Sequence, residues 1–254
     1  GIVAILLNPE PATPMSDEAI ALEQSAEDFL ERNAHLPEYL ARAVAWLYGS
    51  VFCPFIEFLT RPNWLLIILF ILLYKFGDAV LTVMKIPFFL ELGFSNTEIG
   101  TIAKLVGFPP IIIGGLFGGL LLAKTGIMRG LLISGIFMAA SNLVFVLQSW
   151  VGYSQEMLAV TIAIENFTTS MGTVAFVAYL SSLCNIAYTA TQYALLTSFM
   201  AFSRTVMTSG SGWVADQVSW PVFFMLTTLA ALPGLILLVY MIRRFDQAPV
   251  QSPD

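Results

Sequence analysis

Two charged residues, Lys75 and Asp78, lie inside a strongly apolar run over 64–90. A run of this length can cross a bilayer, which takes about 20 residues of helix. Each charge in such a segment costs roughly 2.5–3.5 kcal/mol on insertion scales, so it indicates a function or a dedicated partner. At helical spacing, Thr82 and Lys85 continue the same face as a stripe about 15 Å long. Either this face lines a transport pathway, with Asp78 holding a proton or cation and the lysines attracting an anion, or Lys75 and Asp78 neutralise each other and fix helix packing.

A second carboxylate, Glu165, lies near the middle of a later apolar segment and is followed by Asn166. A carboxylate at that depth is a candidate for proton coupling, and Asn166 is a candidate for contact with the substrate pathway. A static ion pair explains Glu165 equally well. The cations available for that pair are Lys75, Lys104 and Arg204.

Arg204 shares a helix face with Thr208 in another apolar segment. A guanidinium holds a carboxylate through two parallel hydrogen bonds, so Arg204 can bind the carboxylate of a substrate. The alternative is that it neutralises Glu165 or Asp78.

Other polar or small residues of these segments also have two interpretations. Lys104 either lines the pathway or extends its ammonium to the membrane interface. Asn142 either contacts a ligand or forms hydrogen bonds between helices. Two overlapping GxxxG spacings predict close helix packing rather than substrate contact. The residues at these spacings are Gly114, Gly115, Gly118 and Gly119.

Membrane-spanning helices must position these side chains. Six apolar segments are predicted, at about 63–88, 98–122, 129–149, 156–183, 189–211 and 220–242. They lack the period-two alternation of barrel strands. Hydrophobic residues make up 57% of the chain and charged residues 11%, against about 25% charged in an average soluble domain. The prediction is an all-α membrane protein, with a six-transmembrane-helix bundle over 61–244 in a lipid bilayer.

The remaining segments differ in composition from the bundle. Residues 8–37 carry most of the acidic excess and are predicted to form an acidic cytoplasmic linker. Residues 38–60 read as an amphipathic interfacial helix, and 245–254 as a cytoplasmic tail. The short apolar stretch 1–7, in a chain that starts with Gly, resembles the end of a preceding transmembrane helix. These features predict the second half of a longer protein.

Basic residues set the expected orientation. Arg61, Lys124, Arg129 and the pair Arg243-Arg244 fall on one side of an even-numbered bundle. By the positive-inside rule, both ends of the bundle are therefore cytoplasmic.

Composition also excludes classes of function. The net charge of −6 argues against nucleic-acid binding. With His35 in the linker as the only histidine, and with Cys53 and Cys184 far apart in the sequence, no metal site and no cofactor are predicted.

Several short segments between 64 and 238 are specific in combination. They are LYKFGD (73–78), ENF…MGT…AFVA (165–178), LCN (183–185), ATQYALL (190–196), GW (212–213) and ALPGLILL (231–238). In these segments the chain resembles the AmpG muropeptide permeases and, more distantly, acetyl-CoA transporters. The loop 118–129 resembles a degenerate copy of a basic loop motif, with Lys124 and Arg129 but without its usual acidic residue.

The resemblance implies a major facilitator superfamily fold, of which this chain would be the C-terminal half of a twelve-helix transporter. The N-terminal six-helix half would be its partner. The implied function is proton-driven import of GlcNAc-1,6-anhydroMurNAc peptides across a Gram-negative inner membrane, for cell-wall recycling. The expected mechanism is alternating access, in which Lys75 and Arg204 attract the substrate's carboxylates and Asp78 or Glu165 carries the proton. No enzyme activity is expected.

Three alternatives remain open from sequence. The substrate can be another amphiphilic anion, such as acetyl-CoA. A membrane-embedded transferase is a different class, although such enzymes usually need a base or metal and no histidine lies in any apolar segment. A non-transporting sensor subunit fits less well with polar stripes on two segments.

Overall fold

The architecture comes from a computed structural model that describes residues 24, 53–184 and 189–245. The described residues form helices and contain no strand, which confirms the predicted all-α class for this part of the chain. They belong to two compact units, one comprising residues up to 62 with 184–194, the other 63–183 with 195–254. Of the predicted segments, 1–7 lies outside the described residues, as do nearly all of 8–37 and 245–254 and most of 38–60.

The smaller unit contains α4 (Cys53–Thr60), which falls in the predicted amphipathic helix. After its end, Arg61 pairs with Glu57 one turn back, with Nη2 2.7 Å from Oε1. The Glu57 carboxylate also accepts a hydrogen bond from Nε2 of Gln192, whose side chain is fully buried. This polar contact joins α4 to residues more than 130 positions away in the same unit.

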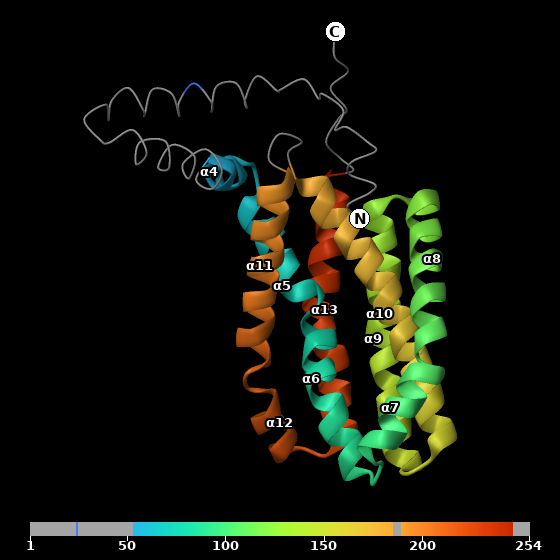
Figure 1. Ribbon diagram of the computed structural model, residues 1–254. Coiled ribbons are helices and arrows are strands. Elements are labelled where there is room, and N and C mark those ends of the chain that lie inside the picture. The colour runs from blue at the N-terminus through green and yellow to red at the C-terminus, as the bar shows by residue number, and fades with distance from the viewer. Residues whose placement is uncertain (1–23, 25–52, 185–188, 246–254) are drawn as a thin grey trace, which may run out of the picture. The chain divides into compact units, whose positions relative to one another are not determined.

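The larger unit has five helical stretches that are long and apolar enough to cross a membrane. The first combines α5 (Trp64–Tyr74) and α6 (Phe76–Glu91); the others are α8 (Phe108–Thr125), α9 (Ile127–Val151), α10 (Gln155–Leu183) and α13 (Trp220–Phe245). In Figure 1, α10 lies beside α8 and α9, and α13 lies beside α5 and α6. Five of the six predicted spans are thus supported by length and composition.

The segment predicted at 189–211 forms α11 (Thr189–Thr208), and α12 (Ser211–Gln217) follows it. At 20 residues α11 is long enough to span, but nine of them are Thr, Ser, Gln or Arg. It is therefore less apolar than the five spans and is not among them. A helix of this composition suits a position beside a polar cavity.

Two predicted segments are interrupted. The second, 98–122, is split into α7 (Asn96–Leu105) and α8 by two residues. The pair Pro109-Pro110 explains the new start, because proline lacks an N–H and is tolerated in the first turn of a helix but not in its interior. The first span is interrupted only at Lys75, whose φ of −101° and ψ of 8° separate α5 from α6.

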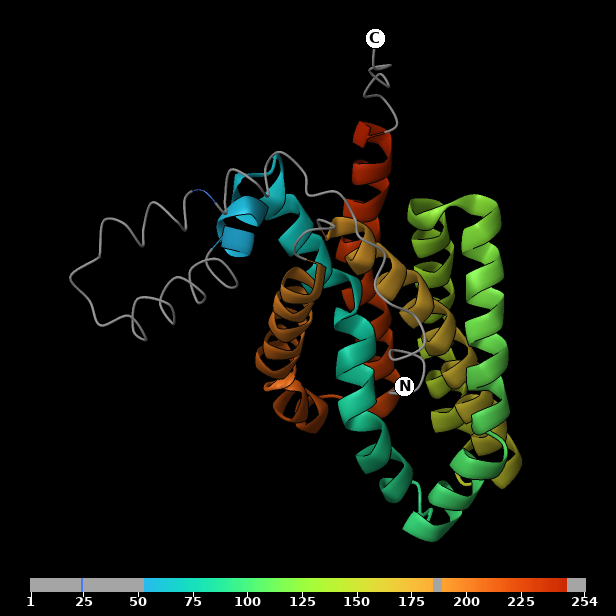
Figure 2. The same cartoon turned by 45° about the horizontal axis from the view of Figure 1, so that its top comes forward.

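Glycines allow α8 to approach α10 closely. A Cβ on Gly114 would lie 2.3 Å from the carbonyl oxygen of Phe167, and one on Gly118 would lie 3.0 Å from that of Met171. A Cβ on Gly115 would lie 3.3 Å from the Ser170 hydroxyl oxygen. A Cβ on Gly119 would meet no atom within 4 Å, so Gly119 does not serve this contact. Figure 2 shows the resulting close pair of helices, α8 and α10. This close packing fixes the position of α10.

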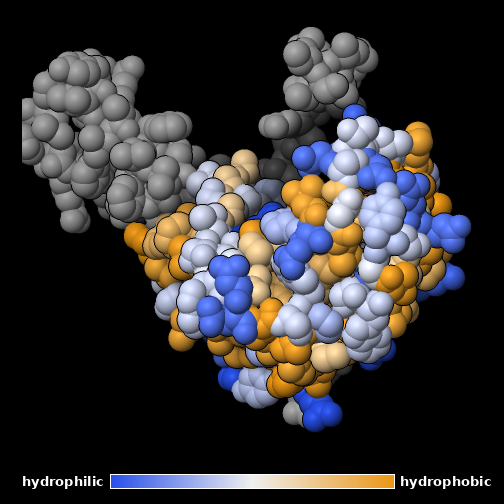
Figure 3. All heavy atoms as spheres, turned by 90° about the horizontal axis from the view of Figure 1, so that it is seen from below, coloured by the Kyte–Doolittle hydropathy of each residue, from blue (hydrophilic) through white to orange (hydrophobic). Residues whose placement is uncertain are grey.

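An aromatic cluster closes one end of the unit. Phe88 packs edge-on against Phe224, with ring centroids 4.7 Å apart, and Phe145 contacts both rings. The end of the unit that carries α7 and α12 shows hydrophilic side chains interspersed with apolar ones (Figure 3). The short connections at this end hold no Lys or Arg, whereas Lys124 and Arg129 lie around the α8–α9 turn at the opposite end.

Candidate functional site

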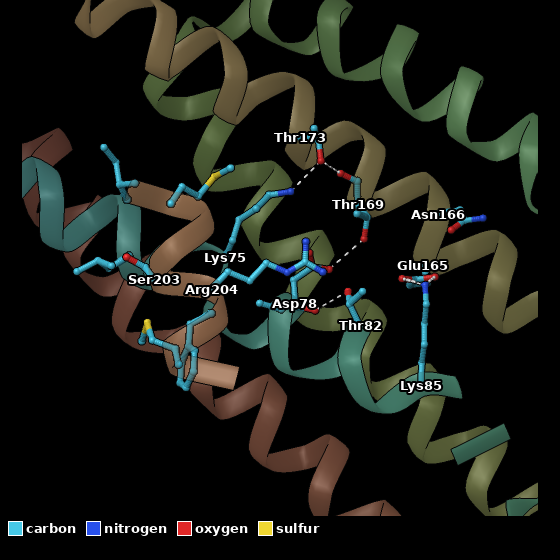
Figure 4. A pocket seen from close by; sticks show the side chains of 16 residues that line it. Lys75, Asp78, Thr82, Lys85, Glu165, Asn166, Thr169, Thr173, Ser203 and Arg204 are labelled. Carbon is cyan, nitrogen blue, oxygen red and sulfur yellow. Dashed lines mark hydrogen bonds and ion pairs between the residues drawn. The ribbon is translucent and has the colours of Figure 1, made fainter. Parts of the chain in front are cut away.

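A cavity of about 390 Å³ lies within the larger unit, lined by apolar and polar residues of α5, α6, α10 and α11 together with Lys75. Figure 4 shows its polar side chains converging from α6, α10 and α11. They are Lys75, Asp78, Thr82, Lys85, Glu165, Asn166, Thr169, Thr173, Ser203 and Arg204. The cavity therefore brings together residues that are more than 120 positions apart in the sequence.

The Glu165 carboxylate is paired. Nζ of Lys85 donates to both of its oxygens, at 2.9 and 3.1 Å. Glu165 is only 4% exposed, and a charge buried to that extent needs a partner of opposite sign. An ion pair was one of the two predicted roles of Glu165, but its partner is Lys85 and not Lys75, Lys104 or Arg204.

Lys75 and Asp78 behave differently from the predicted pair. Within the described residues no ion pair joins them, and each instead bonds to a hydroxyl of α10. Nζ of Lys75 donates to Oγ1 of Thr173 at 2.8 Å, and Oγ1 of Thr169 donates to Oδ1 of Asp78 at 3.1 Å. Although Lys75 interrupts the helix, it lines the same cavity as Asp78, Thr82 and Lys85, the other residues of the predicted stripe.

Arg204 comes from α11 and points toward Asp78 in Figure 4. It is exposed, and no hydrogen bond or ion pair of its guanidinium occurs in the described part of the chain. Its predicted neutralisation of Asp78 or Glu165 by direct pairing is therefore not seen. Thr82 donates to the backbone oxygen of Asp78 at 2.8 Å, so its hydroxyl supports the helix beside the cavity.

The structure does not bring Lys104, Asn142 or Thr208 into this cavity. Lys104 is exposed in the last turn of α7, and Asn142 is buried in α9 at 2% exposure. The hydroxyl of Thr208 donates to the backbone oxygen of Arg204 at 2.8 Å. Because α9 is nearly uniformly apolar, the sequence pattern does not show which of its faces is turned toward the cavity. It therefore gave no sign that Asn142 lies outside the cavity lining.

Asn166 has a structural contact as well as a place in the cavity. Its Nδ2 donates to the carbonyl oxygen of Gly107 at 3.0 Å, in the interruption between α7 and α8. This bond satisfies a backbone group that the broken helix leaves open. If Asn166 also contacts a ligand, it must do so with the polar groups that this bond does not use.

The predicted site does not include three polar cavity residues, Ser203 of α11 and Thr169 and Thr173 of α10. Together with Glu165 the two threonines recur every four residues along α10, which places all three on one helix face. That spacing was a usable signal. The usual role of Thr in apolar helices, bonding to its own backbone, concealed it.

At the end of the unit that carries α7, several hydrogen-bond donors surround one carboxylate, that of Glu98, which lies outside the candidate spans. The Glu98 carboxylate accepts hydrogen bonds from the Tyr153 hydroxyl at 2.5 Å, from Gln155 Nε2 at 2.7 Å, and from the backbone and hydroxyl of Ser95 at 2.8 and 2.7 Å. These bonds, led by the one from Tyr153, lower the pKa of Glu98 from 4.5 to about 2. In return, the bond to Glu98 raises the pKa of the Tyr153 hydroxyl. The cluster fastens the start of α7 to the α9–α10 connection.

The cavity's side chains define what it can bind. The Lys85–Glu165 pair is neutral as a unit, which leaves two cations and one carboxylate that are not paired with each other. Such a site can hold an anion or a zwitterion through charge-assisted hydrogen bonds. Among the described residues no cluster of His, Cys, Asp and Glu is arranged to hold a metal ion.

Part of this sequence is similar to known proteins. No protein-family model matches the chain. A putative transporter AmpG 4 of Rickettsia felis is 37% identical over 203 residues, which cover 80% of this chain and 49% of that protein. A putative transporter AmpG 3 of Rickettsia typhi is 41% identical over 165 residues (65% and 39%), and the anhydromuropeptide permease of Escherichia coli K12 is 38% identical over 194 residues (76% and 40%). The predicted resemblance is thereby confirmed, and this chain belongs with the AmpG-type transporters, spanning about half the length of these relatives.

Proposed function

We propose that the complete protein imports anhydromuropeptides across the inner membrane for cell-wall recycling. One observation carries the proposal: the cavity holds Lys75, Arg204 and Asp78 unpaired with one another, in a chain of the AmpG type. Muropeptides carry carboxylates, and the two cations are suited to bind them. The relatives' names as transporters or permeases support transport rather than an enzyme reaction.

The proposed mechanism is alternating access. This chain would be the C-terminal half of a twelve-helix major facilitator, and an N-terminal half would close the cavity from the other side. Substrate would bind near the midplane of the membrane, between the halves. The exposed position of Arg204 supports this arrangement, because a charged side chain inside a membrane protein requires a polar surrounding on its open side.

Proton coupling would act on Asp78 or Glu165, driven by the proton gradient without a cofactor. Protonation of Glu165 removes the charge that holds Lys85 and so releases the Lys85 ammonium toward the cavity. Protonation of Asp78 removes the one carboxylate that competes with the substrate for Arg204. Either event increases the positive charge offered to an anionic substrate, which couples proton binding to substrate binding.

The proposed orientation places the α8–α9 turn and the end of α13 in the cytoplasm. Lys124 and Arg129 lie at the first position, and Arg243 and Arg244 in the last turn of the second. This distribution supports the positive-inside assignment, and the end with the Glu98 cluster would face the periplasm.

The test is uptake of labelled anhydromuropeptide into right-side-out vesicles that contain the complete transporter. We expect saturable uptake that a protonophore abolishes, and a KM raised about tenfold by Arg204→Gln, the scale of a lost charge-assisted hydrogen bond. Absence of uptake by correctly inserted protein would overturn the muropeptide assignment. Uptake of acetyl-CoA in the same vesicles would then identify the competing anion.

A further inference from the structure

Three contacts cross the cavity in a regular order. Along α10 the residues Glu165, Thr169 and Thr173 face Lys85, Asp78 and Lys75 respectively. The numbers rise along α10 and fall on the facing segment, as expected when the two run in opposite directions (Figure 4). Only the contact of Glu165 is an ion pair; the other two are made by neutral hydroxyls.

Those hydroxyls bind two opposite charges that line the same cavity. Lys75 and Asp78 are three residues apart and line the same cavity, so a direct ion pair is the alternative to the two observed contacts. Each is half-buried, so a direct pair would be partly shielded from water. A paired Lys75 and Asp78 would offer little net charge to a substrate.

We propose that Thr169 and Thr173 are positioning residues that hold Lys75 and Asp78 apart, so that both charges remain available in the cavity. This inference rests on the proposed transport function for its consequence. It does not depend on that function for the geometry. Neither threonine needs to touch the substrate.

The hydrogen bonds of the two hydroxyls fit this role in polarity. The single hydrogen of Thr173 Oγ1 is used toward the backbone oxygen of Thr169 at 2.7 Å, so its lone pairs are free to accept from the Lys75 ammonium. Thr169 uses its hydrogen toward the Asp78 carboxylate. One hydroxyl therefore meets the cation as an acceptor and the other meets the anion as a donor, and exchanging their roles would leave both charges unsatisfied.

The neighbouring hydroxyls of α10 show that this pattern is local to one face. The Thr168 hydroxyl contacts the Ser141 hydroxyl of α9 and the backbone oxygen of Ile164, each at 3.0 Å, and the Ser170 hydroxyl donates to the backbone oxygen of Ile111 in α8 at 2.7 Å. These two residues flank Thr169 in sequence but lie outside the cavity lining. Thr168→Val is therefore a matched control, because it removes a hydroxyl of the same helix from a different face.

The first experiment needs no substrate. In the purified complete transporter, the labelling rate of Lys75 by acetic anhydride is measured by mass spectrometry. Thr173→Val should lower that rate about fivefold, the scale of a partly exposed ion pair, because the freed ammonium turns to Asp78. Thr173→Ser should restore it, Thr168→Val should not change it, and Asp78→Asn should abolish the effect of Thr173→Val. An unchanged rate in Thr173→Val, or an effect that persists in Asp78→Asn, would overturn the proposal.

The second experiment measures uptake by the same variants in vesicles. Thr169→Val/Thr173→Val should raise KM about tenfold with little change in the maximal rate, and the double Ser variant should behave like the parent. A fall in maximal rate alone, equal to that of Thr168→Val, would assign the threonines a structural role only and contradict the proposal. If the parent transports no muropeptide, the proposed function fails, while the labelling result still decides the positioning role.

Discussion

The two carboxylates of the cavity have different kinds of hydrogen-bond donor. Glu165 is almost fully buried and bonds to the Lys85 ammonium through both oxygens. Asp78 is half-buried and bonds to the Thr169 hydroxyl, although Lys75 and Arg204 lie near it in the same cavity. Burial explains the difference, because a deeply buried carboxylate requires a countercharge, whereas a partly solvated one can be held by a neutral donor.

This difference separates two tasks. In a direct ion pair, protonation of the carboxylate frees the ammonium, so such a pair suits proton coupling. Charges that are bonded only to hydroxyls are not neutralised by a partner, so they suit the binding of a charged substrate. Variants of each carboxylate and of its partner distinguish the two tasks.

The largest effect is expected from breaking the buried pair on one side. Lys85→Met should destabilise the protein by about 3–5 kcal/mol, because it leaves the Glu165 carboxylate buried without a partner. Lys85→Met/Glu165→Met should recover most of that loss, since both charges are then removed. Thermal unfolding of the complete transporter in detergent measures both.

If the single and double variants lose equal stability, the pair does not hold the structure as inferred. Uptake by the recovered double variant is the second readout. Proton-driven uptake at the parental rate would exclude Glu165 as the coupling carboxylate.

Asp78→Asn should leave stability nearly unchanged, because an Asn Oδ1 can still accept from Thr169. Proton-driven uptake should nevertheless fall about tenfold to a hundredfold, the scale of a lost coupling free energy, because an Asn side chain cannot take up and release a proton. Asp216→Asn is the matched control, since Asp216 is an exposed carboxylate outside this cavity. Equal losses of uptake in the two variants would contradict a specific role of Asp78 in transport.

Gly114→Ala tests whether both contacts depend on the position of α10. A Cβ at this site would lie 2.3 Å from the Phe167 backbone oxygen and must move α10 away from α8. We expect a loss of about 1–3 kcal/mol, as for overpacked cores, and a fall in uptake. Gly119→Ala should be neutral, because nothing lies within 4 Å of that position. Equal behaviour of the two alanine variants would contradict the packing seen here.

The helical class and all five charged cavity residues could be predicted from the sequence. The cost of placing a charge in an apolar helix is a local property, so Lys75, Asp78, Lys85, Glu165 and Arg204 stand out without any knowledge of the fold. Their partners could not be predicted in the same way. Spacing within one helix suggested a Lys75–Asp78 pair, whereas the observed partners depend on the register between α6 and α10, which no single segment contains.

Lys104 illustrates a second limit of the sequence pattern. It was placed in a continuous segment, but Pro109-Pro110 restarts the helix and leaves Lys104 in the separate α7. The prolines were visible in the sequence, and their effect on the helix was the missed signal. The position of Lys104 therefore follows from local backbone chemistry, unlike the partner of Glu165.

The smallest effect concerns a third carboxylate, Glu98, which lies outside the spans. Like Asp78 it is held by neutral donors, so it extends the comparison. Its lowered pKa means that the charged form is favoured in the folded protein, so its contribution to stability is present above about pH 4.5 and is lost as the pH falls toward about 2. Glu98→Gln should therefore lower the melting temperature slightly at pH 7, and the difference from the parent should shrink through that window. Tyr153→Phe, which removes the donor with the largest influence on the pKa, should shift the same window toward higher pH. A difference between parent and Glu98→Gln that stays constant from pH 7 to pH 3 would show that neutral donors do not stabilise the charge of this carboxylate, and would weaken the same argument for Asp78.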